Sequence, residues 1–357
     1  MAHFEHYYLG SLGRDGFSSL FGDLLERGGP DIVYIIKGSS GNGKSTLLKR
    51  AAARAVERGL SVDYIHCSAD PDSLDGIAVP ARSLVMLDGT APHTVEPERL
   101  WGRHRVLSLY RYLDWDGLLA EGEAAAADSD RYRDLMRRAG RFAAAAASLT
   151  QEVFRSARPA LLQPKLTASF SRLGRRFFPG QGGRGRLSRR YDTALTPDGL
   201  AGWFERNSMG YREVIRIADS SLAAGSLALE TLKNTALAAG YDVEASYHPL
   251  MPGQLLETVT VREASVLAGL SSFLGRRQAA DAKVIYAARF YDQAALRERR
   301  SRSALCRRCA LELIETAAGL MTEAKAVHDG IERRFASHCD FEQLEADTAK
   351  LLDALPL

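Results

Sequence analysis

Residues 31–48 read DIVYIIKGSSGNGKSTLL, and this stretch decides the fold class. An apolar run of strand length leads into a glycine-rich turn, and residues 45–59 then supply good helix formers and a closing glycine. Two further apolar runs follow, SVDYIHC at residues 61–67 and SLVMLD at residues 83–88. Strands that alternate with a crossover helix predict an α/β fold with a parallel sheet.

The turn has the spacing of a phosphate-binding loop, in which a glycine and four further residues precede Gly-Lys-Ser. Glycines bring successive N–H groups against phosphates, and the following helix N-terminus adds partial positive charge. We expect Lys44 to reach the β and γ phosphates of a nucleoside triphosphate and the Ser45 hydroxyl to ligate Mg²⁺. The predicted nucleotide-binding residues are Gly38, Ser39, Ser40, Gly41, Asn42, Gly43, Lys44, Ser45 and Thr46.

Asp88 ends the third apolar run, where this architecture places the carboxylate that holds magnesium through water. The alternative is an aspartate that simply ends a strand. No glutamate follows Asp88, so fast intrinsic hydrolysis is not predicted. Thr90 and His93 lie just beyond and could sense the γ-phosphate, although a place in a surface loop is the commoner fate of such a histidine.

A run of acidic residues follows the second strand, on the sheet edge where ligands bind in α/β folds. It contains Asp70, Asp72, Ser73 and Asp75. One of these carboxylates could orient water or accept a proton from an acceptor hydroxyl, and Asp72 is our first choice. Asp-Pro-Asp-Ser is equally common turn chemistry. The candidate catalytic residues are therefore Lys44, Asp88 and Asp72.

The chain also contains an internal repeat. Placing Val33 on Val214 without a gap puts Ser45 on Ser226 and Gly59 on Gly240. Matches at strand ends, loop starts and the helix-closing glycine favour a true repeat over chance similarity. The residues aligned with Gly38, Gly43, Lys44 and Asp88 are Asp219, Ala224, Gly225 and Gly269. An acidic side chain at the loop and no lysine would repel a triphosphate, so the second half is predicted to be a pseudo-site.

The repeat and the helical stretches define the expected domain organisation. Residues 1–162 are predicted to form a P-loop NTPase domain with a helical appendage. Residues 191–357 are predicted to form a degenerate P-loop NTPase-like domain with a helical appendage of its own. Each appendage is expected to be a helical hairpin. The segment 163–190, rich in arginine and glycine, is the candidate linker; it could touch nucleic acid or the ATP site, but a solvated loop is favoured. Arg262, Arg276 and Arg277 are arginines of the second half that could serve the first site.

Composition limits the possible partners. With 47 basic and 44 acidic residues among 357, the net charge is +3, which argues against a surface built for nucleic acid or anionic membrane. No secretory signal and no apolar run of membrane-spanning length is present, so we expect a cytoplasmic protein without a membrane partner. Four cysteines do not make a disulfide framework. Cys306 and Cys309 lie in a helical pattern, which disfavours a metal site.

Several motifs together carry a family resemblance. They are HYYLGSLGRDGFSSLF at residues 6–21, KGSSGNGKSTLLK at 37–49, HCSADPDSLDG at 66–76, LDGTAPH at 87–93 and RRYDTALTPDGL at 189–200. This combination resembles a family of uncharacterised bacterial ATP-binding proteins made of two tandem P-loop domains. The resemblance spans nearly the whole chain and implies ATP binding without implying a reaction. Family members usually have two intact loops, so the second half of this chain departs from the pattern.

The leading functional hypothesis is an ATP- and Mg²⁺-binding P-loop NTPase with one active site and one pseudo-site, acting as a slow ATPase or a nucleotide-dependent switch. The absence of an Asn-Lys-x-Asp guanine-reading motif and of a transporter signature loop favours ATP over GTP. A small-molecule kinase that places an acceptor hydroxyl with Asp72 or Asp70 is the alternative, and a scaffold that keeps nucleotide only for stability is the third possibility. The expected partners are nucleotide and an unidentified protein or small molecule.

Overall fold

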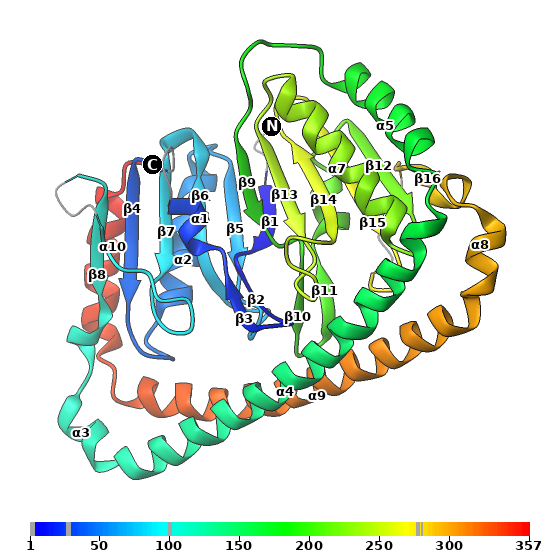
Figure 1. The fold of residues 1–357 in the computed structure, drawn as a ribbon. Helices are drawn as coiled ribbons and strands as arrows, with labels where there is room; N and C mark the ends of the chain where they lie inside the picture. Colours follow the sequence, from blue (N-terminus) through cyan, green and yellow to red (C-terminus); the bar gives the residue numbers. More distant parts are fainter. Residues whose placement is uncertain (1–3, 26–29, 99–101, 276–278, 280) are drawn as a thin grey trace. The chain divides into compact units, whose positions relative to one another are not determined.

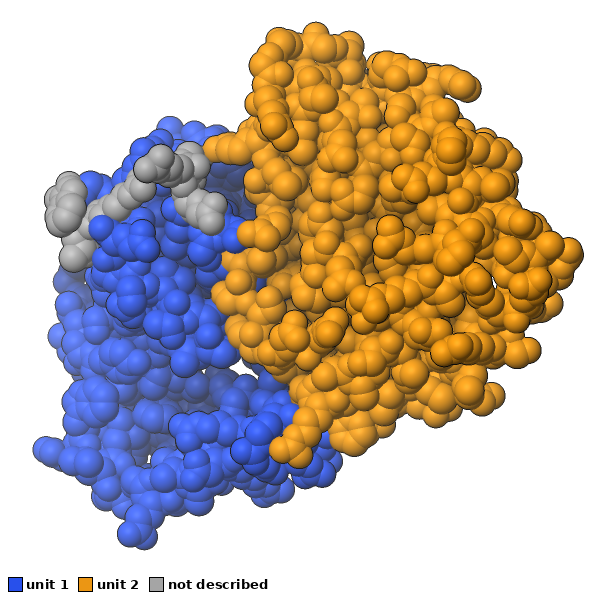
Figure 2. Space-filling model, in the orientation of Figure 1, with its two compact units in different colours: residues 1–10, 21–139, 319–357 blue, residues 11–20, 140–318 orange. Residues whose placement is uncertain are grey.

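The computed structural model describes residues 4–25, 30–98, 102–275, 279 and 281–357. The chain divides into two compact units, neither of which is continuous in sequence (Figure 2). The first unit contains residues 1–10, 21–139 and 319–357, and the second contains residues 11–20 and 140–318. Each unit is built around one six-stranded sheet. The units therefore do not follow the expected boundaries at residues 162 and 191.

The sheet of the first unit has the strand order β1-β5-β6-β7-β4-β8. In that order the strands span Phe4–Tyr8, Val62–His66, Leu74–Val79, Leu84–Asp88, Ile32–Lys37 and His104–Ser108. Strand β6 is antiparallel to both of its neighbours, and the other pairs are parallel. The sheet is thus mixed rather than parallel. Only the short 3-10 turn η1 (Pro80–Arg82) and Ser83 join β6 to β7, and a parallel connection needs a crossover of a dozen or more residues.

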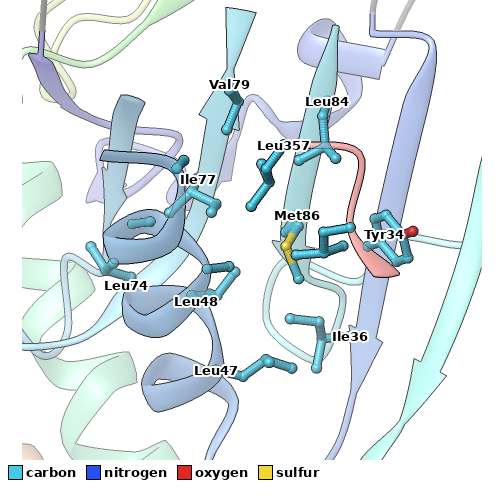
Figure 3. Packing of buried hydrophobic residues seen from close by; sticks show 14 of the residues in the cluster. Tyr34, Ile36, Leu47, Leu48, Leu74, Ile77, Val79, Leu84, Met86 and Leu357 are labelled. Carbon is cyan, nitrogen blue, oxygen red and sulfur yellow. The ribbon is translucent and has the colours of Figure 1, made fainter. Parts of the chain in front are cut away.

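Helix α2 (Lys44–Glu57) packs on this sheet through one face. Its buried residues are Leu47, Leu48, Ala51, Ala52 and Ala55, which recur at helical spacing. They join Ile36 of β4 and Met86 of β7 in one buried cluster, together with Leu344, Leu355 and Leu357 from the end of the chain. Figure 3 shows Leu357 among these side chains. The C-terminal segment therefore completes the core on which the glycine-rich loop rests.

The sheet of the second unit repeats this topology, with the order β9-β13-β14-β15-β12-β16. In that order the strands span Leu187–Arg190, Val243–Tyr247, Leu256–Val261, Val266–Ser271, Glu213–Ala218 and Lys283–Tyr286. Strand β14 takes the antiparallel place of β6, and helix α7 (Ala223–Ala238) that of α2. The hairpins β2–β3 (Gly10–Gly13, Gly16–Ser19) and β10–β11 (Thr193–Thr196, Gly199–Gly202) precede the short helices α1 (Phe21–Leu25) and α6 (Phe204–Ser208).

The gap-free alignment of the two halves holds in the structure up to β13 and then slips by one residue. Ile36 pairs with Asp88, and its counterpart Ile217 pairs with Leu270. Leu270, rather than Gly269, therefore occupies the position of Asp88. The second half lacks the carboxylate in either alignment.

Each half contributes one long helix instead of a helical hairpin. Helix α4 (Gly122–Ala157) and helix α9 (Arg300–Ser337) run antiparallel along each other (Figure 1). Glu152 pairs with Arg302 at 3.2 Å in the second unit, and Asp128 pairs with Arg334 at 3.2 Å in the first. The short helices α3 (Trp115–Ala120) and α8 (Gln293–Glu298) lead into them, after the turns η2 (Leu109–Tyr112) and η4 (Ala287–Phe290).

The helix at the end of each half of the sequence packs in the unit that contains the sheet of the other half. Helix α4 begins in the first unit and ends in the second, where η3 (Arg158–Ala160) and α5 (Gln163–Phe177) follow it and α5 packs on α7. Helix α9 begins in the second unit and ends in the first, where α10 (Phe341–Ala354) follows it and packs on α2. The expected linker at residues 163–190 is therefore largely structured, because α5 and β9 lie within it.

The folding of α5 has a simple local cause. Leu166, Phe170 and Gly174 recur at helical spacing and are buried, and Gly174 lies against Thr235 of α7. The arginines of α5, Arg172, Arg175 and Arg176, are exposed. Arg190, at the end of the segment, is instead buried and lies 2.8 Å from Glu244. Among the described residues, no helix combines the length and the apolar character that crossing a membrane requires.

Candidate functional site

Residues 38–43 connect β4 to α2, and their glycines are required by the geometry of the turn. Gly41 and Gly43 have φ of 75° and 88°, in the left-handed region that other residues avoid. A Cβ at Gly38 would lie 2.6 Å from the side chain of Asn42. The buried Asn42 amide in turn donates to the Ser39 carbonyl at 2.7 Å, which closes the loop on itself.

The loop presents unused hydrogen-bond donors. Among the described residues, none accepts a hydrogen bond from the backbone N–H groups of residues 40–44, and Gly43 gives α2 no side-chain cap. The buried Ser39 hydroxyl also has no partner there. Unpaired amides at a helix N-terminus carry partial positive charge and favour an anion.

Lys44 lies between the loop and the neighbouring strand β7. Its Nζ donates to the carbonyls of Ser39 at 2.6 Å and Gly38 at 3.1 Å, and it lies 3.7 Å from Asp88 Oδ2. Asp88 Oδ1 accepts hydrogen bonds from Thr90 N at 2.9 Å and Thr90 Oγ1 at 2.5 Å. The structure thus brings together Lys44, Asp88 and Thr90, three residues that the sequence singled out. They meet because β4 and β7 are adjacent and parallel.

The Ser45 hydroxyl accepts a hydrogen bond from Leu74 N at 3.0 Å. The same bond exists in the second half, where Ser226 Oγ accepts from Leu256 N at 3.1 Å. Since the second half lacks the lysine, this shared bond joins the helix to the antiparallel strand and is structural. A hydroxyl oxygen has two lone pairs, so one of them on Ser45 remains for a metal ion.

The aspartates after β5 lie in different surroundings. Asp72 is exposed, and no hydrogen bond or ion pair of its side chain occurs among the described residues. Asp70 accepts from Ser73 Oγ at 2.6 Å and lies 3.4 Å from Lys325 Nζ. Asp75, by contrast, is buried in β6. Asp75 is thus the most buried of these three carboxylates, whereas Asp72, the first choice from the sequence, is exposed.

Burial raises the pKa of Asp75 above the usual carboxyl value, and the nearby charge of Asp88 raises it further. His93 opposes this shift and lies with its Nε2 3.9 Å from Asp75 Oδ1. His93 is itself 7% exposed and stacks on Phe21 at a centroid distance of 4.7 Å, so it is not a surface-loop histidine. A buried carboxyl and a histidine at the same sheet edge can exchange a proton with a bound molecule.

In the second half, a carboxylate of the chain itself fills the corresponding loop. Asp219 Oδ1 accepts from Ser221 N at 2.9 Å, and Asp219 Oδ2 accepts from Gly225 N at 2.9 Å. The Tyr291 hydroxyl donates to Asp219 Oδ2 at 2.8 Å and accepts from Ala224 N at 2.7 Å. The amides that would face a phosphate are thus occupied by an internal anion. Burial raises the pKa of Asp219, which is 6% exposed.

The remaining sequence candidates are three arginines and a pair of cysteines in the second half of the chain. Arg262 is paired with Glu244 at 2.8 Å, and Arg276 and Arg277 lie outside the described residues. Among the described residues, the one cluster with the spacing of metal ligands is His328, Asp329 and Glu332, and it does not include Cys306 or Cys309.

Comparison with protein-family models, with curated proteins and with solved structures found no match.

Proposed function

We propose that the chain binds ATP and Mg²⁺ in the loop at residues 38–46 and acts as a slow ATPase or a nucleotide-dependent switch with one active site. The proposal rests mainly on the position of Lys44. This residue lies between Asp88 and the loop in which the amides of residues 40–44 have no acceptor among the described residues. The amides and the ammonium group would bind the phosphates, and Ser45 and Asp88 would hold Mg²⁺, Asp88 through water. The metal would neutralise charge on the terminal phosphates.

The arrangement of the second half supports the proposal of a single nucleotide site per chain. Asp219 satisfies the amides of its loop, and Gly225 and Leu270 stand where the first half has Lys44 and Asp88. A polyphosphate would have to displace a buried carboxylate without any lysine to receive it. The second unit is therefore proposed to be a pseudo-site.

The surroundings of Asp88 support slow rather than fast hydrolysis. Gly89 follows it, and a Cβ at this position would lie 2.4 Å from Ile35 Cγ2. A glutamate that polarises the attacking water does not fit there. The chemical step would then depend on Mg²⁺, Lys44 and whatever group orients the acceptor.

A direct test is isothermal calorimetry of Mg-ATP binding. Lys44→Ala is expected to weaken binding by about 10- to 100-fold, the usual worth of a charge-assisted contact. Lys49→Ala is the matched control, because Lys49 lies on the same helix with its side chain exposed. Equal affinity in wild type and Lys44→Ala, or no binding by the wild type, would refute the proposal.

The second candidate is a small-molecule kinase, and Asp75 favours it. A buried carboxyl with a raised pKa, close to Asp88 and His93, has the properties of a group that accepts a proton from an acceptor hydroxyl. Labelled ATP incubated with a pool of metabolites distinguishes the two. A kinase yields a labelled organic phosphate whose formation Asp75→Asn abolishes, whereas an ATPase yields inorganic phosphate.

A further inference from the structure

The glycine-rich loop of the first unit is packed against a helix that belongs to the second half of the sequence. Ser40 Oγ and His328 Nε2 of α9 are 3.0 Å apart. A Cβ at Gly41 would lie 2.2 Å from the carbonyl oxygen of Glu332, so the backbone of α9 touches the loop directly. Both contacts lie within the first unit.

Further contacts fix this part of α9. Lys325 Nζ lies 3.4 Å from Asp70 Oδ1, in the segment after β5, and pairs with Asp329 at 2.9 Å. The ring of Tyr132, from α4, lies 5.4 Å from the ring of His328. Asp329 is thus engaged by a lysine, and the cluster of His328, Asp329 and Glu332 is better explained by packing on the loop than by a metal ion.

The other end of α9 contacts the pseudo-site loop. Arg307 Nη1 donates to the carbonyl of Ser220 at 3.5 Å, within the second unit. Ser220 aligns with Ser39 of the first loop. Arg307 and His328 both belong to helix α9. The same helix therefore contacts a glycine-rich loop in one unit and its degenerate copy in the other.

We propose that His328 is a positioning residue of the nucleotide site, supplied by the second half of the chain. It holds Ser40, and through Ser40 it holds the amides of residues 40–44 in the arrangement that receives the phosphates. Nucleotide binding is thereby coupled to the C-terminal part of α9. This inference rests on the proposed nucleotide site, and its test must separate the two.

The test is a double-mutant cycle on Mg-ATP affinity with His328→Ala and Ser40→Ala. Each single variant is expected to weaken binding about three- to tenfold, the worth of one hydrogen bond, and the double variant no more than either. His328→Gln is expected to restore most of the affinity, since its amide can replace the ring nitrogen as a partner of Ser40. Arg333→Ala, an exposed position on the same helix, is the control.

Hydrogen exchange of the full chain gives an independent readout. Mg-ATP is expected to change amide protection at residues 325–334 in the wild type and much less in His328→Ala. If the wild type binds Mg-ATP but His328→Ala binds equally well, or if the variants are additive, the positioning role is refuted and the nucleotide site stands. If the wild type binds no nucleotide, the proposed function itself fails.

Discussion

The Tyr291 hydroxyl donates a hydrogen bond of 2.8 Å to the carboxylate of Asp219, which fills the degenerate loop of the second unit. This pair explains why two loops of the same topology differ in the groups that their backbone amides contact. In the first half Gly38 stands at the position of Asp219, and among the described residues no carboxylate accepts a hydrogen bond from the amides of residues 40–44. In the second half, the chain provides the negative charge itself.

Replacing Asp219 by glycine is expected to create an anion site in the second unit. The backbone amides of Ser221 and Gly225 would lose their acceptor, and sulfate could take its place. Sulfate should therefore raise the melting temperature of Asp219→Gly more than that of its parent. The comparison is made in a Lys44→Ala background, to weaken the response of the first loop. Equal responses to sulfate would contradict the account of this loop.

The loss of Asp219 is also expected to lower stability. Its carboxylate accepts hydrogen bonds from two backbone amides and a hydroxyl, and donors left unsatisfied in a buried place cost about 1–3 kcal/mol. Tyr291→Phe removes only one of these donors and should cost less than Asp219→Ala. Urea unfolding measures both variants. A larger loss for Tyr291→Phe would show that the tyrosine matters mainly for other reasons.

Asp75 is expected to make stability depend on pH. Burial raises its pKa in the folded protein, so the folded state holds the proton more tightly than the unfolded chain. Stability therefore falls as the pH rises from the ordinary carboxyl value of 3.8 through the raised value. Asp75→Asn removes this loss, and its stability relative to wild type should increase with pH across that window. A difference between Asp75→Asn and wild type that stays constant with pH would contradict the prediction.

Gly41→Ala is expected to destabilise the protein more than Gly59→Ala. Both glycines have nearly the same φ, 75° and 74°, so the cost of a left-handed alanine, about 1–2 kcal/mol, is common to both. At Gly41 the new Cβ would also meet the backbone of α9, whereas none of the described atoms lies within 4 Å of a Cβ at Gly59. Chemical denaturation measures the difference. Equal losses would show that α9 does not press against the loop.

The C-terminal helix α10 is expected to matter for the first unit. Leu344 is buried, with a methyl group 3.1 Å from the position that a Cβ on Gly43 would take. Leu344→Ala should cost about 2 kcal/mol or more, the usual loss for a buried leucine. Leu119→Ala, at a position 77% exposed, should cost almost nothing in the same unfolding measurement. A neutral Leu344→Ala would indicate that α10 detaches from α2 in solution.

The sequence was most informative where local chemistry determines the structure. The spacing of glycines and Lys44 predicted a strand, loop and helix, and β4, the loop and α2 are found there. The apolar run that ends at Asp88 became β7, directly beside β4. The repeat was also visible, because strands β12 and β13 lie where the gap-free alignment places them.

Features that depend on distant contacts were missed. Strand β6 was not predicted. It contains Asp75 and Gly76, which are poor strand formers, yet it is buried between β5 and β7. The exchange of α5 and α10 between units leaves no local signal, since an amphipathic helix does not specify which sheet it covers. The contact of His328 with Ser40 joins residues 288 positions apart and follows from that exchange.

The most direct test of the central claim is to count nucleotides per chain by equilibrium titration with a hydrolysis-resistant ATP analogue and Mg²⁺. The account predicts one nucleotide per chain, with affinity weakened about 10- to 100-fold in Lys44→Ala and unchanged in Tyr291→Phe. Two nucleotides per chain, or one whose binding survives Lys44→Ala and fails in Tyr291→Phe, would contradict it.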